Sequence, residues 1–341
     1  MLHSVHALRF VASLGVIIHH SLTSYGPNLT SVLVGAAGVD VFFVISGVVI
    51  GYADHNEGAL VFALKRLIRM IPLYWLATLT CALMRHSMYG EVPTWEQVAR
   101  SLLLVPDFSQ PNWLPLYVPA WTLCFEVAFY ALFALLLPWA GRATTLSAAI
   151  ISVALVAVAV PVPFVAGAFF DTSYFLEFAA GLLMAEALYR GFRLPPKLGL
   201  LSLVLGISIF AVHRNGWHSS HLLGWGIPAM LVVLGGLGLE QKAFWRNRVL
   251  VLGGSASYAL YLFHLTTMEP LLLWLERSGL DLHSRLRFIA LRELILVGSA
   301  VCIGVLIHLV MERPMLSMLR RVLLRPRKAV QTAGPASHVP L

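Results

Sequence analysis

The chain has 341 residues, of which 59% are hydrophobic and 12% are charged, and its mean hydropathy is +0.81. Because soluble globular domains carry about 25% charged residues, this composition excludes that class and predicts a polytopic membrane protein. The net charge of +8 is explained by membrane topology and by anionic headgroups, so membrane lipids are expected partners and nucleic acid is not.

Ten apolar segments in chain order predict the membrane-spanning helices. Runs of roughly 16 to 23 residues are long enough to cross a hydrocarbon core about 30 Å thick. They cover approximately residues 5–25, 34–53, 70–86, 116–138, 144–163, 172–189, 198–213, 220–239, 249–275 and 294–311. We therefore expect an all-α transmembrane bundle of about ten helices over residues 1–314, followed by a basic, disordered cytoplasmic tail over 315–341.

The Lys and Arg side chains predict the orientation of this bundle. With the N-terminus in the cytoplasm, 17 of the 24 basic residues lie inside and 7 lie outside. The positive-inside rule then predicts that both chain termini are cytoplasmic.

The first span carries two ionisable residues, Arg9 and His20, at membrane depth. An ionisable group there costs a few kcal/mol or more, so each is a functional-site hypothesis by default. Their separation of eleven residues is three helical turns plus about 20°, so they share a helix face that His19 does not share. They lie roughly 16 Å apart along the axis, which predicts two stations along one path through the bilayer.

Basic residues also precede the third predicted span. Arg66 and Arg69 lie at the same cytoplasmic level as Arg9, and three guanidinium groups at one membrane mouth suit a polyanion such as a phosphate-bearing ligand. Arginines before a span also follow from positive-inside topology alone, so this second interpretation of Arg66 and Arg69 stays open.

Acidic residues and histidines mark the deeper levels. Asp40 falls at a depth similar to that of His20, where a carboxylate would orient the imidazole and raise its basicity, as a general base needs. A buried pair that only locks two helices is the competing interpretation. Glu126 lies near mid-membrane and needs either a partner or a function, and His264 lies toward the outer side.

The remaining polar groups are less informative. Glu177 is expected to cap, pair or snorkel, and His221 lies near a span end and is assigned no role. Cys81, Cys124 and Cys302 match no metal or redox spacing, and no linear His, Cys, Asp or Glu pattern indicates a metal site. We therefore expect no metal.

The longest predicted loop, 87–115, is rich in Pro and Trp and is expected to face outward. It contains a short amphipathic stretch near 94–104, and a loop of this length is commonly functional. It is interpreted either as part of an acceptor site or lid, or as an interfacial helix that holds tryptophans at headgroup level.

Six segments together resemble the acyltransferase-3 family of integral membrane acyltransferases, which modify bacterial surface carbohydrates and other acceptors. The segments, which run in the family's order from residue 7 to 314, are LRFVASLGVIIHHS with Arg9 and His20, GVDVFFVISGVVIGY with Asp40 and Ser46, RLIRMIPLYW with Arg66 and Arg69, WTLCFEVAFY with Trp121, Glu126 and Tyr130, SYALYLFH with Ser257, Tyr258, Tyr261 and His264, and MERP. Val48 replaces the usual aromatic residue, and Phe10 follows Arg9 where Gly is common.

The resemblance implies ten core helices and a multi-pass protein of the bacterial inner membrane. It also implies transfer of an acyl group, usually acetyl, from cytoplasmic acyl-CoA to a hydroxyl of an acceptor. It further implies that Arg9, His20, Arg66 and Arg69 matter for activity.

These observations combine into one functional hypothesis. Acyl-CoA docks with its phosphates on Arg9, Arg66 and Arg69, and His20, oriented by Asp40, deprotonates a hydroxyl of a carbohydrate or lipid-linked glycan acceptor. Glu126 and His264 are further catalytic candidates. The expected substrate-binding residues are Ser46, Trp121, Tyr130, Tyr258 and Tyr261.

A transporter or flippase is the alternative function, in which the same ionisable residues form a proton relay for a carbohydrate or lipid-linked substrate. The sequence leaves open the acyl group, the acceptor, the choice between direct and covalent transfer, and the oligomeric state.

Overall fold

The computed structural model describes residues 2–23, 34–52, 57–105, 114–140, 143–159, 173–213, 221–278 and 286–324. Within these ranges every regular element is a helix, so the predicted all-α class is confirmed. The elements up to residue 159 are α1 His3–Thr23, η1 Val34–Ala37, α3 Gly38–Gly51, α4 Ala59–Tyr89, α5 Trp95–Leu102, η2 Val118–Ala120, α6 Trp121–Ala140 and α7 Thr144–Ala159. The later elements are α9 Ser173–Tyr189, α10 Pro196–His213, the π-helical turn η4 Leu222–Gly226, α11 Ile227–Gly238, η5 Ala243–Arg246, α12 Arg248–Arg277, α13 Leu286–Ile307, the π-helical turn η6 His308–Glu312 and α14 Arg313–Leu323.

Several of these helices are long and apolar enough to cross a membrane. Among the described residues six helical segments meet that standard, and three shorter apolar helices cover 35–51, 144–155 and 222–238. Each of the ten predicted spans overlaps a helix. The count of ten crossings and the cytoplasmic placement of both termini stay predictions.

The third helix is longer than its predicted span. α4 begins at Ala59 and includes Pro72, so Arg66 and Arg69 lie within the helix and not ahead of it. The predicted span started at residue 70 because the apolar run begins after Arg69. An arginine is nevertheless tolerated inside a membrane helix when it faces the protein interior.

The start of the predicted tail is also structured. Residues 313–323 form the helix α14, which carries Arg313, Arg320 and Arg321. None of the residues of this helix is buried. The expectation of disorder was therefore wrong as far as Leu323, because regularly spaced leucines and methionines among the arginines make this stretch amphipathic. Residues 325–341 lie outside the described residues.

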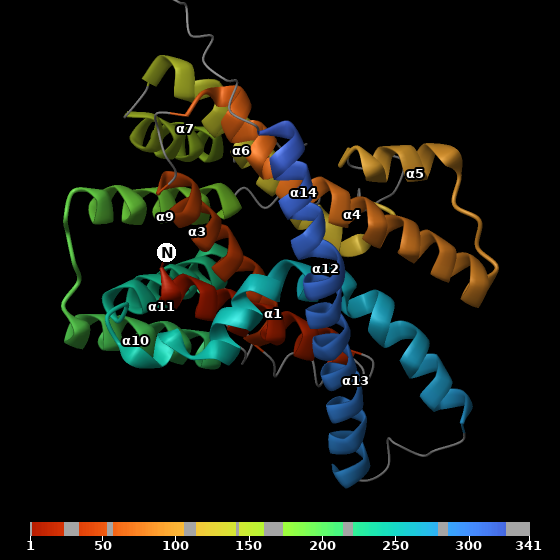
Figure 1. Cartoon of the computed structure of the whole chain (residues 1–341). Coiled ribbons are helices and arrows are strands. Elements are labelled where there is room, and N and C mark those ends of the chain that lie inside the picture. The colour runs from red at the N-terminus through yellow and green to blue at the C-terminus, as the bar shows by residue number, and fades with distance from the viewer. Residues whose placement is uncertain are drawn as a thin grey trace, which may run out of the picture.

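Helices α3 and α9 pack in parallel at a very close distance through two glycines (Figure 1). A Cβ added to Gly47 of α3 would lie 2.9 Å from the Cα of Gly181 on α9, and the reverse substitution is equally crowded. Small residues allow membrane helices to pack backbone to backbone, which aligns the two helices in register.

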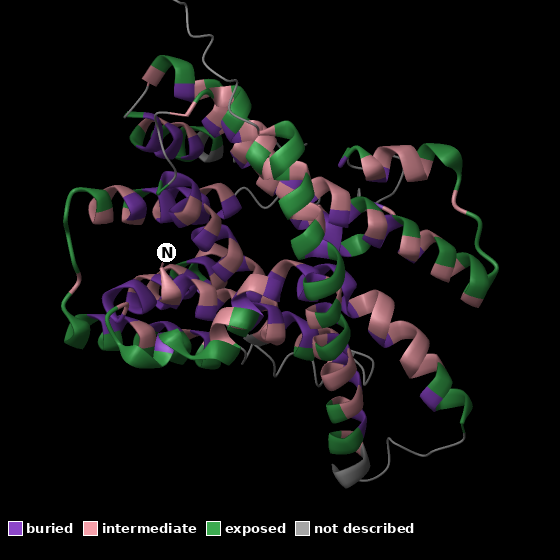
Figure 2. Cartoon of the chain, in the orientation of Figure 1, coloured by how far each residue is buried: buried purple, intermediate pink, exposed green. Residues whose placement is uncertain are grey.

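The buried residues concentrate where α1, α3, α9, α11 and α12 meet, whereas α13 and α14 carry many exposed positions (Figure 2). On α10 most of the exposed residues are large and apolar, among them Leu201, Val204 and Ile207. An apolar outer surface of this kind is the one that a lipid environment requires.

The amphipathic stretch predicted near 94–104 is confirmed as helix α5. A capping box at Thr94 and Gln97 starts the helix, and the hydroxyl of Tyr74 and the indole N–H of Trp75 donate to carbonyl oxygens at its end, at 2.5 and 2.9 Å. Gly90 ends the preceding helix with φ of 70°, a left-handed conformation that favours glycine. Residues 106–113 of the predicted loop lie outside the described residues.

Candidate functional site

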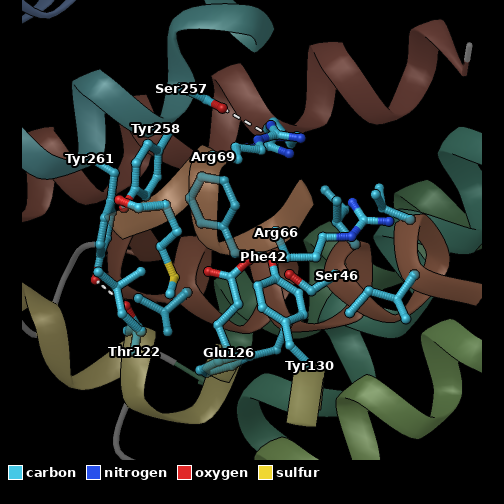
Figure 3. Close-up of a pocket in the computed structure, with 18 residues that line it drawn as sticks. Phe42, Ser46, Arg66, Arg69, Thr122, Glu126, Tyr130, Ser257, Tyr258 and Tyr261 are labelled. Carbon is cyan, nitrogen blue, oxygen red and sulfur yellow. Dashed lines mark hydrogen bonds between the residues drawn. The ribbon is translucent and has the colours of Figure 1, made fainter. Parts of the chain in front are cut away.

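A pocket lies between α1, α3, α4, α6 and α12 (Figure 3). The predicted site residues that line it are Arg9, Ser46, Arg66, Arg69, Glu126, Tyr130, Tyr258 and Tyr261. These residues come from all five helices, so the fold brings together motifs that are spread over most of the chain. We refer to this cavity as the arginine pocket.

The charged residues of the arginine pocket do not balance. Among the described residues, Arg9, Arg66 and Arg69 line it together with a single carboxylate, that of Glu126. Arg9 donates from Nε to the neutral hydroxyl of Ser257 at 3.1 Å. Glu126 and the buried Glu312, which does not line the pocket, are the carboxylates whose negative charge acts on Arg9. Buried charges are normally paired, so an excess of cations in a cavity indicates an anionic ligand.

Arg66 provides the most direct indication of that ligand. Its guanidinium lies 5.2 Å from the centre of the Phe62 ring, which fixes the side chain by a cation–π contact. Its Nε is buried and has no hydrogen-bond partner among the described residues. A buried N–H without a partner costs free energy, and an incoming phosphate oxygen would remove that cost.

The tyrosines of the pocket are held by hydrogen bonds. Tyr130 donates to the carboxylate of Glu126, one helical turn earlier on α6. Tyr258 of α12 donates to the carbonyl oxygen of Met70 at 2.8 Å, across to α4. These bonds fix the walls of the pocket before any ligand arrives.

Apolar side chains form the rest of the wall. Phe42, Val49 and Met70 line the pocket beside the polar residues, and Phe42 packs against Tyr261 with ring centres 5.9 Å apart. A pocket with cations and an apolar lining accommodates a ligand that is anionic at one end and aliphatic along its length.

His20 and His264 lie against each other, with ring centres 5.1 Å apart. The contact joins α1 to α12, the same two helices that the bond from Arg9 to Ser257 joins, so Arg9 and His20 do share a face. We refer to His20 and His264 as the histidine pair. Neither lines the arginine pocket.

His264 has a defined tautomer. Its Nδ1 lies 2.7 Å from the carbonyl oxygen of Tyr261, which can only accept, so Nδ1 carries the hydrogen of the neutral ring. Nε2 is then a lone-pair acceptor, and it is buried without a hydrogen-bond partner among the described residues. A neutral imidazole with a free lone pair is suited to accept a proton.

Tyr261 connects the histidine pair with the pocket. Its hydroxyl donates to the carbonyl oxygen of Pro119 at 3.0 Å, and its ring centre lies 6.0 Å from that of His264. Because Tyr261 also lines the arginine pocket, the histidine pair lies directly behind one pocket wall.

Asp40 does not have the predicted partner. Its carboxylate bonds to Nε2 of His221 at 2.6 Å, and not to His20. Asp40 and His20 were predicted to meet because they lie at a similar depth along their helix axes. Depth does not define the direction in which each side chain points away from its helix. The prediction that Asp40 orients His20 was therefore wrong.

Trp121 also lies apart from the pocket. It belongs to an aromatic cluster with Phe43, Phe125 and Tyr174, with ring centres between 5.5 and 6.3 Å from its own. Phe43 lines the pocket, so Trp121 supports the wall from behind.

Sequence reasoning missed some of the pocket residues. Phe42 and Thr122 were assigned no role, although both lie inside the segments FFVISG and WTLCFE that carried the resemblance. Ser257 was noted only as part of its motif, and its bond to Arg9 spans 248 residues of chain. No local pattern indicates a contact of that length.

Comparison with known proteins agrees with this arrangement. A family model described as an acyltransferase domain, that of the acyltransferase-3 family, matches residues 2–310. The chain belongs to the acyltransferase-3 family. It is 31% identical over 318 residues to the exopolysaccharide production protein ExoZ of Rhizobium meliloti (strain 1021), an alignment that covers 88% of this chain and 94% of that protein. It is 27% identical over 341 residues to the acyltransferase MdmB of Streptomyces mycarofaciens, with 88% and 84% covered. No solved structure is significantly similar to the chain.

This acyltransferase-3 protein is thus a multi-pass membrane acyltransferase with the family's motif residues gathered around one pocket.

Proposed function

We propose that the protein is an O-acyltransferase of the bacterial inner membrane. It moves an acyl group, which we propose to be acetyl, from cytoplasmic acyl-CoA to a hydroxyl of a carbohydrate acceptor such as exopolysaccharide or O-antigen. The observation that carries the proposal is the arginine pocket. Within the described ranges, Arg9, Arg66 and Arg69 line it with one carboxylate, and the Nε of Arg66 has no hydrogen-bond partner.

The donor fits this pocket by its chemistry. The phosphates of CoA are anions for which a guanidinium offers two parallel N–H donors. The pantetheine arm is a flexible chain of apolar and amide groups, suited to the wall formed by Phe42, Val49 and Met70. In this arrangement the thioester points toward Tyr261, beyond which lies the histidine pair.

The transfer requires a base at the thioester end. His20 removes the proton of the acceptor hydroxyl, the oxygen forms a bond to the acyl carbon, and the carbon–sulfur bond breaks. The proton passes from the histidine to the leaving thiolate, so the products are an ester and CoA. His264, whose Nε2 accepts no hydrogen bond from any described residue, lies beside His20 and holds or relays this proton.

The carbohydrate acceptor is proposed from the relative named as an exopolysaccharide production protein, which aligns over 94% of its length. The second relative is named only as an acyltransferase and leaves the acceptor class open.

The test is turnover of acyl-CoA by purified protein in liposomes. Release of CoA from acetyl-CoA and succinyl-CoA would be followed in the presence of an oligosaccharide acceptor, and the acceptor ester would be identified by mass spectrometry. The proposal predicts saturable, acceptor-dependent release that His20→Ala abolishes and that Arg66→Gln weakens through a higher KM for the donor.

The matched control for Arg66→Gln is Arg190→Gln. Arg190 lies on the surface and pairs with Glu186 at 2.6 Å, outside the pocket, so its substitution is expected to leave turnover unchanged. Folded protein that consumes no acyl-CoA, but moves a labelled oligosaccharide across the liposome, would contradict the proposal and favour the transporter.

A further inference from the structure

A second group of ionisable residues lies on the other side of α3 from the arginines. It consists of Asp40 of α3, Glu177 of α9 and His221, which directly precedes the π-helical turn η4; we refer to it as the acid–histidine cluster. One ligand atom from each residue lies within 4.8 Å of the other two. The cluster therefore joins three helices at one point of the bundle.

Glu177 is the member whose surroundings call for a ligand. Its side chain is 0% exposed, and neither carboxylate oxygen has a hydrogen-bond partner in the part of the chain that the structure describes. The nearest opposite charge available is that of His221, whose Nε2 lies 3.7 Å from Oε1 of Glu177 but is already bonded to Asp40 at 2.6 Å. A buried carboxylate without hydrogen bonds is strongly unfavourable unless something else compensates it.

The charges of the cluster do not sum to zero when all three groups are ionised. Two carboxylates with one imidazolium then leave one net negative charge inside a bundle that faces lipid, and either a further proton or a cation would remove it. With a divalent cation and a neutral imidazole, the same three side chains are neutral overall. Two carboxylate oxygens and one imidazole nitrogen are also a donor set that divalent transition metals accept.

The local backbone makes room at this point. Gly226 lies against Glu177, and a Cβ added there would lie 2.9 Å from Oε1. The π-helical turn over Leu222–Gly226 follows His221, and such turns are frequent at functional sites. Tyr174 closes one side, with its ring centre 4.9 Å from that of His221.

We propose that Asp40, Glu177 and His221 bind one divalent transition-metal ion that ties α3, α9 and η4 together. The ion takes the place of the hydrogen between Nε2 of His221 and the Asp40 carboxylate, so binding releases one proton. Glu177 supplies the third ligand after a small side-chain shift. Linear spacing gave no indication of this site, because its residues are 137 and 44 positions apart.

The site is independent of the proposed acyl transfer. Asp40, Glu177 and His221 do not line the arginine pocket, and the connection between the two regions runs through Phe43, which lines the pocket and packs against Tyr174 at 4.7 Å. Loss of the metal would therefore be expected to disturb the pocket wall without removing any group that touches the donor.

The experiment measures metal in the full-length protein. Protein carrying no polyhistidine tag would be purified in detergent without chelator, stripped, reloaded separately with Zn²⁺ and Mn²⁺, and analysed by elemental mass spectrometry. We expect about one ion per chain for the wild type and for the control Glu269→Gln, which removes a carboxylate elsewhere in the bundle. Glu177→Gln, which keeps the shape of the side chain, is expected to lower the affinity at least tenfold.

A second measurement does not depend on any variant. X-ray absorption of the zinc-loaded wild type is expected to show one imidazole among oxygen ligands, with Zn–N and Zn–O distances of about 2.0–2.2 Å. Fewer than about one ion in ten chains for both metals, coordination by several imidazoles, or equal loss of metal in Glu177→Gln and Glu269→Gln would each overturn the proposal. The first of these outcomes would identify the cluster as a hydrogen-bonded acid–histidine group held by protons alone.

Discussion

The arginine pocket and the acid–histidine cluster share helix α3 and have opposite charge. Ser46 of α3 lines the pocket with three arginines and one carboxylate, whereas Asp40 of the same helix belongs to a cluster with two carboxylates and one histidine. Both regions lie inside a bundle with an apolar exterior, where an unbalanced charge is costly. The difference indicates that the two proposed ligands have opposite charge. An anion would balance the arginines of the pocket, and a cation would balance the carboxylates of the cluster.

The largest expected effect is on the rate of acyl transfer, and it comes from the histidine pair, which belongs to neither of the two regions. His20→Ala is expected to lower the rate of acyl transfer by about 10²–10⁴-fold, because a positioned general base contributes that much. Steady-state turnover in liposomes measures it. His19→Ala is the comparison variant: His19 directly precedes His20 on α1, its Cβ lies beside Gly35, and its ring meets that of His20 edge-on, with ring centres 5.4 Å apart. It therefore removes a neighbouring imidazole but leaves the contact between His20 and His264. Equal losses in the two variants would show that the effect is structural.

The next effect concerns the cationic side of the comparison. Arg66→Gln removes a charged donor from the pocket, and a hydrogen bond to a charged group is worth about 1.5–3 kcal/mol, so the KM for acyl-CoA should rise roughly 10- to 150-fold. The turnover number at saturating donor should change much less. A fall in turnover number at unchanged KM would mean that Arg66 does not hold the donor.

A substitution in α3 itself is expected to disturb both regions. Gly47→Ala places a methyl group against the backbone of α9, and overpacking of this kind costs about 1–3 kcal/mol. Thermal unfolding in detergent should therefore show a lower melting temperature. Gly298→Ala of α13 is the control, because no described residue lies within 4 Å of the added carbon. A melting temperature for Gly47→Ala at or above the wild-type value would contradict the close packing of α3 on α9.

The smallest effect has the opposite sign to that of Arg66→Gln. Glu126→Gln removes the one carboxylate among the pocket arginines, while its amide oxygen still accepts from Tyr130. The donor then meets less negative charge, and its dissociation constant should fall by about 2- to 10-fold at an effective dielectric constant near 20. Equilibrium binding of CoA measures it. Weaker binding would mean that Glu126 instead holds the arginines in place.

Much of the pocket was predictable because several of its residues can be recognised within a single segment of sequence. Arg9 and Glu126 each carry a charge inside an apolar run, and such a charge is seldom kept without a function. Arg66 and Arg69 were selected because they lie at the same predicted level as Arg9. The resemblance added Tyr258 and Tyr261, which no charge argument would have selected. The helical class followed from hydropathy alone.

The second region was not predictable for a geometric reason. Depth along a helix axis can be counted from the sequence, but the direction in which a side chain points toward other helices cannot. Asp40 and His20 were matched in depth, yet Asp40 faces His221 from a segment 181 residues later. Glu177 and His221 looked ordinary because they come from different segments of the chain, and only packing places them together.

The most direct test is the equilibrium binding of donor fragments to the wild-type protein in nanodiscs, at fixed ionic strength. Acetyl-CoA, 3′-dephospho-CoA and pantetheine would be compared by calorimetry. If Arg9, Arg66 and Arg69 hold the CoA phosphates, acetyl-CoA binds most tightly, removal of the 3′-phosphate weakens binding roughly tenfold or more, and pantetheine does not bind measurably. Equal affinity for all three ligands, or no binding of acetyl-CoA by folded protein, would contradict the assignment of the arginine pocket as the donor site.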